Sequence, residues 1–76
     1  MPESILREVW MEVLKIDEGD FYETGGSSMD AILIESALLQ KGWSLSAADI
    51  LQNPKIHEMA ALMVPAEEID WEVETE

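Results

Sequence analysis

The stretch Gly25-Gly26-Ser27-Ser28-Met29 decides the arrangement of this chain, because a loop ends and a helix begins within it. Residues 15–27 are rich in turn-forming side chains, which predicts a long loop. Apolar side chains then recur as far as residue 41, and Gly42 suits the C-terminal end of a helix. We therefore expect a helix over about residues 28–41 that follows a glycine-rich loop.

Ser28 is the candidate for chemistry in this stretch. Gly25 and Gly26 have no side chain, so another molecule can approach the backbone closely. A helix N-terminus has unpaired N–H groups and a partial positive charge, so a phosphate esterified to Ser28 would find donors there. The alternative is that Ser27 or Ser28 only caps the helix. Both interpretations can hold, since one serine can cap while the other is modified.

Helical spacing of apolar side chains also predicts a first helix over about residues 2–14. Phe21 and Tyr22 interrupt the loop that follows, and we expect them to anchor it on the core. After the second helix, a short connection is expected over residues 43–45. A brief helix is expected over residues 46–51, since its serine and aspartate have the spacing of a capping box.

The last helix is expected to follow directly. Asn53 is predicted to be its cap and Pro54 its first residue, and Pro65 ends it. Its apolar side would consist of Ile56, Met59, Ala60 and Met63. No strand is predicted. The predicted fold class is therefore all-α, with three main helices, one short helix and a long loop between the first two helices.

The second helix is expected to be apolar on more than one side. Its inward-facing residues are predicted to be Ala31, Ile34 and Leu38. The apolar residues predicted to be partly exposed near its start are Met29, Ile32 or Leu33. In a domain this small, such an exposed apolar face indicates a surface that meets a partner.

The composition restricts the possible functions. The 76 residues suffice for one small domain, and the absence of cysteine excludes a disulfide or a thiolate nucleophile. The net charge of −13 disfavours nucleic acid and anionic membranes and favours basic protein partners. No segment is long and apolar enough to span a membrane, and no secretory signal is visible at Met1. We therefore expect a monomeric cytoplasmic protein.

The acidic residues divide the chain into two parts. Residues 65–76 carry six acidic and no basic side chains, whereas residues 1–64 carry 11 acidic and four basic ones. In the acidic part, Ile69, Trp71 and Val73 alternate with acids, which would suit a weak strand or a docking peptide. Its charge and terminal position favour a flexible tail after a folded domain over residues 1–64. Met1 and the acidic end favour a free-standing protein over a domain cut from a larger one.

Catalysis by the chain itself is not expected. His57 is the only histidine, and we expect it to be partly exposed on the last helix. A nucleophile elbow at Ser28 would need a glycine two residues later, where this chain has Asp30. A calcium loop beginning at Asp17 would need glutamate at its twelfth position, which is Ser28. The sequence therefore predicts neither an enzyme nor a metal site.

Three blocks of the chain resemble one protein family. Val9–Leu14 (Val-Trp-Met-Glu-Val-Leu) resembles the end of the family's first helix. Asp20–Met29 (Asp-Phe-Tyr-Glu-Thr-Gly-Gly-Ser-Ser-Met) resembles its core motif, a Phe-Phe-Glu-Leu-Gly-Gly-His-Ser-Leu pattern. Leu45–Ile56 (Leu-Ser-Ala-Ala-Asp-Ile-Leu-Gln-Asn-Pro-Lys-Ile) resembles the junction of its third and last helices. The family is the peptidyl carrier protein, or thiolation domain, of nonribosomal peptide synthetases, within the acyl carrier protein superfamily.

The resemblance implies a carrier domain over residues 1–64 that is modified on Ser28. A phosphopantetheinyl transferase would attach 4′-phosphopantetheine from coenzyme A there, with Gly25, Gly26 and Ser27 completing the attachment site. The thiol of the arm would then hold an aminoacyl, peptidyl or acyl group as a thioester. The implied partners are an adenylation or acyl-loading enzyme and downstream condensing, modifying or thioesterase enzymes.

In this family the second helix and the preceding loop meet the partner enzymes. By resemblance, Met29, Ile32 and Leu33 would supply apolar contacts, and Asp30 and Glu35 would meet basic residues. Asp30 has an alternative role, because an acid in the first turn of a helix also complements the helix dipole.

The chain departs from the family pattern around Ser28. Ser27 stands where peptidyl carriers often have His and fatty-acid carriers have Asp, and it is a second possible acceptor. Thr24 and Met29 each replace Leu. The Gly-Gly pair favours the peptidyl branch, whereas the negative charge favours the acyl branch. An unmodified docking domain with the carrier fold is the alternative function.

Overall fold

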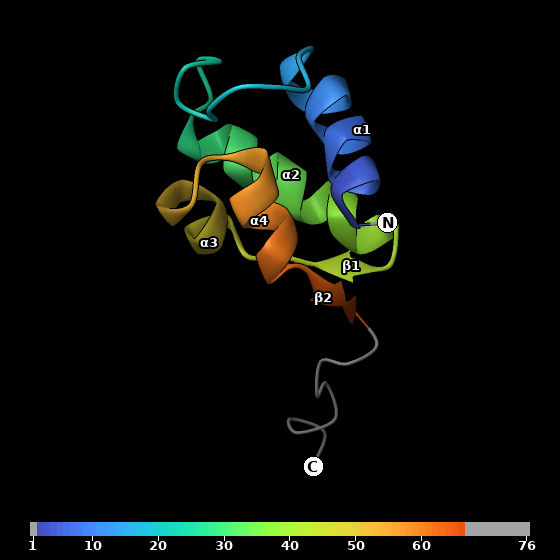
Figure 1. Cartoon of the computed structure of the whole chain (residues 1–76). Helices are drawn as coiled ribbons and strands as arrows, with labels where there is room; N and C mark the ends of the chain where they lie inside the picture. Colours follow the sequence, from blue (N-terminus) through green and yellow to red (C-terminus); the bar gives the residue numbers. More distant parts are fainter. Residues whose placement is uncertain (1, 67–76) are drawn as a thin grey trace.

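The computed structural model describes residues 2–66. This part of the chain forms four helices around one core, and two short strands lie at the end opposite the long loop (Figure 1). The elements are α1 Pro2–Leu14, α2 Ser28–Gln40, β1 Trp43–Ser44, α3 Ala47–Gln52, α4 Ile56–Leu62 and β2 Val64–Pro65. The predicted helical class and the order of the helices are confirmed.

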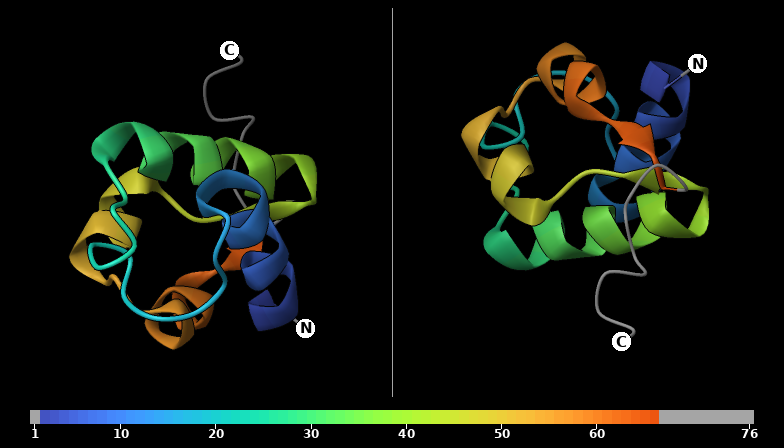
Figure 2. Two further views of the ribbon diagram at one scale, coloured as in Figure 1. Left: turned by 90° about the horizontal axis from the view of Figure 1, so that it is seen from above. Right: turned by 90° about the horizontal axis from the view of Figure 1, so that it is seen from below.

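The core lies between the helices, which surround it when the molecule is seen from above the long loop (Figure 2). Its fully buried members from the first two helices are Leu6, Val9, Trp10, Ala31, Ile34 and Leu38. α3 adds Ile50, and α4 adds Ile56 and Met59. The predicted inward face of α2 is therefore confirmed, and burial of this apolar surface is the main stabilising contribution.

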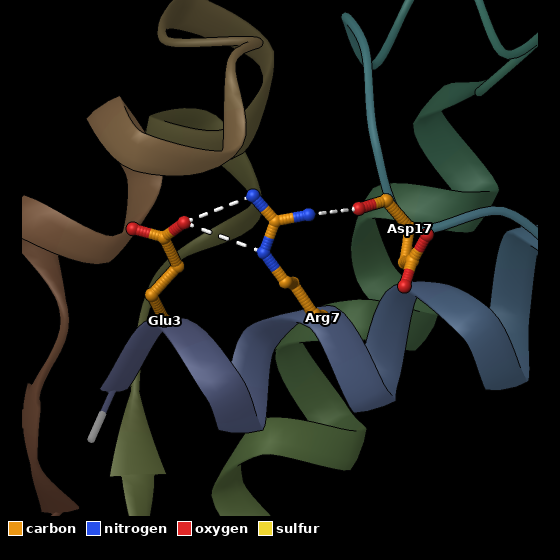
Figure 3. A network of polar contacts seen from close by, with 3 residues as sticks. All are labelled: Glu3, Arg7 and Asp17. Carbon is orange, nitrogen blue, oxygen red and sulfur yellow. Dashed lines mark hydrogen bonds and ion pairs between the residues drawn. The ribbon is translucent and has the colours of Figure 1, made fainter.

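The long loop is attached to α1 in two places. The guanidinium of Arg7 donates to the Glu3 carboxylate at 3.0 Å and to the backbone carbonyl oxygen of Asp17 (Figure 3). Further along the loop, Phe21 is fully buried and its ring packs edge-to-face on Trp10, with centroids 6.1 Å apart. These contacts hold a segment without regular structure in a defined position.

The prediction that the chain has no strand is wrong. β1 and β2 pair antiparallel, with Trp43 opposite Pro65, and the N–H of Ala66 donates to the carbonyl of Gly42 at 2.9 Å. Strands of two residues are too short to show a periodic pattern. The predicted domain boundary after residue 64 falls inside β2. Beyond Ala66, the predicted flexible tail lies outside the described residues.

The predicted start of the last helix is also wrong. α4 begins at Ile56, and its N-cap is Lys55, whose side chain makes no capping hydrogen bond. Asn53 instead donates from its side-chain amide to the carbonyl of Asp49, within α3. Asn53 therefore stabilises the end of α3 rather than the start of α4.

Contact with the long loop explains this shift. The N–H of Phe21 donates to the carbonyl of Pro54 at 2.7 Å, and Asp20 forms an isolated antiparallel bridge with Lys55. Residues 54 and 55 are therefore extended and hold the loop, and the helix starts only after them. This tertiary contact overrides the local preference of an Asn-Pro pair for a helix start.

Candidate functional site

Ser27 is the N-cap of α2. Its Oγ accepts the N–H of Asp30 at 3.3 Å, and the Asp30 carboxylate accepts the N–H of Ser27 at 3.1 Å. Together these reciprocal bonds form a capping box. The cap that the sequence assigned to one of two serines therefore belongs to Ser27.

Ser28 is the first residue of α2, and it is exposed. Among residues 2–66, the side-chain hydrogen bonds at this helix start join Ser27 and Asp30, and the Ser28 hydroxyl takes part in none of them. The first N–H groups of a helix have no partner within the helix and carry partial positive charge. Ser28 therefore fits the attachment of a phosphate-linked group, because its oxygen is accessible and donors lie beside it.

Gly26 brings the loop backbone against the ring of Phe21. A Cβ atom on Gly26 would lie 2.6–2.8 Å from three carbon atoms of that buried ring, which is closer than van der Waals contact. Gly25 meets a different requirement, since its φ of +85° lies in the left-handed region that favours glycine. The sequence assigned both glycines to a turn and to the close approach of another molecule, but it did not predict the contact of Gly26 with the Phe21 ring.

Tyr22 ties the same loop to α3. It is exposed, but its hydroxyl donates to the carbonyl of Leu51 at 2.6 Å, and its ring packs edge-to-face on Phe21 with centroids 5.7 Å apart. Within the loop, the Thr24 hydroxyl donates to the carbonyl of Phe21, also at 2.6 Å. The prediction that both aromatic residues anchor the loop is confirmed, Phe21 by burial and Tyr22 by a hydrogen bond.

The apolar residues predicted to meet a partner lie on the surface of α2. Met29, Ile32 and Leu33 are 63%, 50% and 48% exposed. They follow Ser28 directly, on the first two turns of the helix that it begins. A molecule bound at Ser28 would therefore also meet this apolar surface.

Both carboxylates predicted to meet a partner have contacts within the chain. Asp30 belongs to the capping box of α2. Glu35 is half-buried, and its Oε1 accepts the N–H of Ala47, the first residue of α3, at 3.3 Å. Each carboxylate thus supports a helix N-terminus, and its role toward a partner stays a prediction.

The other candidate residues lie away from Ser28. His57 is exposed, and with Arg7 and Lys55 it lines a charged hollow of about 400 Å³ to which Ser28 does not contribute. Residues 2–66 contain no group of three or more His, Cys, Asp or Glu side chains that could hold a metal ion. None of the helices in this part of the chain is long and apolar enough to cross a membrane.

A small four-helix domain with an exposed serine at the start of its second helix is typical of a carrier domain. Residues 4–63 match the family model described as phosphopantetheine attachment site. Because this match covers most of the chain, the chain belongs to the phosphopantetheine-attachment family, and it is a peptidyl carrier domain. Domains of this family hold 4′-phosphopantetheine covalently and are generally non-catalytic.

Similar sequences occur in nonribosomal peptide synthetases. The chain is 37% identical over 67 residues to nonribosomal peptide synthetase sidD of Aspergillus fumigatus and 38% identical over 68 residues to apicidin F synthase of Gibberella fujikuroi. These matches cover 80% and 84% of this chain but only 3% and 1% of the two relatives. The chain thus corresponds to a small part of each relative.

Solved structures show the same fold. A structure described as a non-ribosomal PCP domain has a TM-score of 0.78 and 29% identity, and the match covers 84% of this chain and 88% of that one. The crystal structure of holo T3CT has a TM-score of 0.75 and 30% identity, and its match covers 80% of this chain and 90% of that one. The predicted carrier fold is confirmed over most of both chains.

Proposed function

We propose that this domain tethers an aminoacyl, peptidyl or acyl intermediate as a thioester on a 4′-phosphopantetheine arm attached to Ser28. The supporting observation is the different use of two adjacent serines. The Ser27 hydroxyl accepts the hydrogen bond that caps α2, whereas Ser28 is exposed and its hydroxyl takes no part in the capping box. Gly25 and Gly26 shape the turn that keeps the two serines in these positions.

The loading step needs little chemistry from the domain itself. A bond forms between Ser28 Oγ and the phosphorus next to pantetheine, the phosphoanhydride bond of coenzyme A breaks, adenosine 3′,5′-bisphosphate leaves with the bonding electrons, and the serine proton passes to the transferase or solvent. The N-terminus of α2 stabilises the phosphodiester that results. Once attached, the arm supplies a thiol, which this cysteine-free chain lacks. The domain is accordingly the substrate of a phosphopantetheinyl transferase and not a catalyst.

The partner enzymes are those of nonribosomal peptide synthesis or a related pathway. They would include an adenylation or acyl-loading enzyme and downstream condensing, modifying or thioesterase enzymes. Met29, Ile32 and Leu33 would form the apolar part of the contact, because they are exposed beside Ser28. Asp30 and Glu35 would add negative charge that attracts basic partner surfaces and speeds their encounter.

Intact mass spectrometry tests this function directly. The protein is incubated with coenzyme A, Mg²⁺ and a broad-specificity phosphopantetheinyl transferase, beside the variants Ser28→Ala and Ser27→Ala. We expect the parent and Ser27→Ala to gain the mass of one phosphopantetheine and Ser28→Ala to gain none. Ser27→Ala is the matched control, because it removes a neighbouring hydroxyl and a helix cap but not the acceptor.

Two other outcomes would contradict the proposal. A mass gain in Ser28→Ala that is lost in Ser27→Ala would move the attachment to Ser27. The absence of any gain in a folded parent would exclude the thioester function and would favour an unmodified docking domain. Circular dichroism of each variant establishes that it is folded.

A further inference from the structure

α3 is a short helix whose position depends on contacts at its ends. It has six residues, and Ile50 is the one among them that is fully buried. A helix of this length is not stable by itself in water, so contacts with the rest of the domain must hold it. It packs mainly against α2, the helix that begins at Ser28, and to a smaller extent against α4.

Tyr22 holds the C-terminal end of α3. Its hydroxyl donates at 2.6 Å to the carbonyl of Leu51, which lies in the last turn, where carbonyl groups have no partner within the helix. On the loop side, the Tyr22 ring packs on Phe21, and Phe21 lies directly under Gly26. A continuous set of contacts therefore joins the end of α3 to the turn that presents Ser28.

Glu35 holds the other end of α3. Its carboxylate accepts the N–H of Ala47 at 3.3 Å, in addition to the cap that Ser46 provides through the N–H of Asp49. α3 is thus tied at its start to α2 and at its end to the loop. These are the two elements that lie on either side of Ser28.

The tie at Tyr22 depends on its phenolic hydroxyl. In the pattern quoted above, a phenylalanine stands where this chain has Tyr22, and phenylalanine has no hydroxyl to donate. The hydrogen bond to Leu51 joins residues 29 positions apart in the sequence, so it constrains the tertiary arrangement. The aromatic ring alone would still pack on Phe21 but would leave the end of α3 without this donor.

We propose that Tyr22 is a positioning residue for carrier function, whose hydroxyl holds α3 against the loop that presents Ser28. A partner enzyme then meets the loop, α2 and α3 as one preformed surface, and less ordering is needed on binding. This inference rests on the carrier function proposed above. It predicts that loss of the hydroxyl weakens binding of the partner without slowing the chemical step.

The variant Tyr22→Phe tests this inference, because it removes one oxygen atom and keeps the ring. We expect the amide hydrogens of α3 to exchange about two- to tenfold faster, which corresponds to the net contribution of one hydrogen bond. We expect the KM of the apo protein for the phosphopantetheinyl transferase to rise by the same factor while kcat stays unchanged. Amide exchange in α1 serves as the internal reference.

Thr24→Val is the matched control. It removes a hydroxyl from the same loop and breaks a hydrogen bond of the same 2.6 Å length, but that bond ends on Phe21 within the loop and does not reach α3. We expect Thr24→Val to leave the exchange of α3 amides unchanged. A change common to both variants would reflect general loosening of the loop and would overturn the specific role of Tyr22.

The remaining outcomes separate this inference from the carrier function. Unchanged α3 exchange in Tyr22→Phe would overturn the inference, whatever happens to KM, and so would faster exchange with an unchanged KM. In both cases the carrier function would still hold, provided that the unsubstituted protein gains phosphopantetheine. If the unsubstituted protein gains no phosphopantetheine, the carrier function itself is overturned, and the positioning role together with it.

Discussion

At the residue scale, Gly26 and Phe21 together determine where Ser28 lies. Phe21 is fully buried against Trp10, and Gly26 crosses its ring with no space for a side chain. The next residue caps α2, and the one after it is Ser28. The Ser28 hydroxyl, the proposed attachment oxygen, is therefore placed by a packing contact in the core, two residues away from it.

Gly26→Ala should destabilise the domain. Its Cβ would overlap a buried ring, and overpacking of this kind costs about 1–3 kcal/mol. The free energy of unfolding, measured by urea denaturation, should fall by that amount. In a Phe21→Leu background the cost of Gly26→Ala should drop by at least half, because the smaller side chain leaves space. An equal cost in both backgrounds would show that the ring is not the cause.

At the element scale, α2 has one face in the core and one face exposed. Ala31, Ile34 and Leu38 are fully buried, whereas Ile32 and Leu33 are about half exposed. The exposed apolar residues contribute little to folding, since much of their surface stays in water. Their location beside Ser28 suits a contact that forms only when a partner binds.

Leu33→Ala should weaken the contact with partner enzymes while leaving the fold intact. We expect Leu33 to be one of the few interface residues whose truncation costs about 1 kcal/mol or more, so the KM for the transferase should rise about fivefold or more. Leu62→Ala is the control, because Leu62 is similarly exposed, 41% against 48%, but lies on α4. Equal effects of the two variants on KM would exclude α2 as the docking face.

At the scale of the whole molecule, the described domain extends as far as Ala66. Pro65 pairs with Trp43, and Ala66 donates to Gly42, so the contacts of the body continue past residue 64. Residues 67–76 carry six acidic side chains and no basic one. We propose that the acidic residues beyond this strand pair add charge but little stability.

Two truncations test this boundary. Ending the chain after Ala66 should change the free energy of unfolding by less than about 0.5 kcal/mol, as for changes outside the core. Ending it after Val64 should cost about 1 kcal/mol more, because it removes the Ala66 hydrogen bond and the pairing of Pro65. The difference between the two truncations in urea denaturation is the measured quantity. A large loss already after Ala66 would show that residues 67–76 pack on the body.

The charge of the whole molecule affects its encounters with partners more than its fold. Residues 1–64 carry 11 acidic and four basic side chains. Within residues 2–66, Arg7 forms an ion pair with Glu3 and Lys41 forms one with Glu12. Exposed pairs of this kind contribute little to stability. The excess of negative charge therefore acts mainly through attraction of basic surfaces, and added salt weakens this attraction.

The sequence by itself determined the features that depend on neighbouring residues. α1 follows from the helical spacing of its apolar residues, and α2 follows from a run of apolar residues that ends at Gly42. The helix starts at Ser27 and Ser46 follow from capping side chains. Local preferences and tertiary contacts agree at these positions, so reading the sequence was sufficient.

Only the tertiary structure decided the features that join distant residues. β1 pairs with β2, although two helices separate them in the sequence. The N–H of Phe21 donates to the carbonyl of Pro54, and the hydroxyl of Tyr22 donates to the carbonyl of Leu51. The sequence therefore predicted a helix start at Asn53 and Pro54, where the chain instead extends to hold the loop. Such contacts leave no periodic pattern, because each one depends on a single pair of residues that the fold brings together. For the same reason, the sequence and the family resemblance predict attachment at Ser28 but not the contacts that position it.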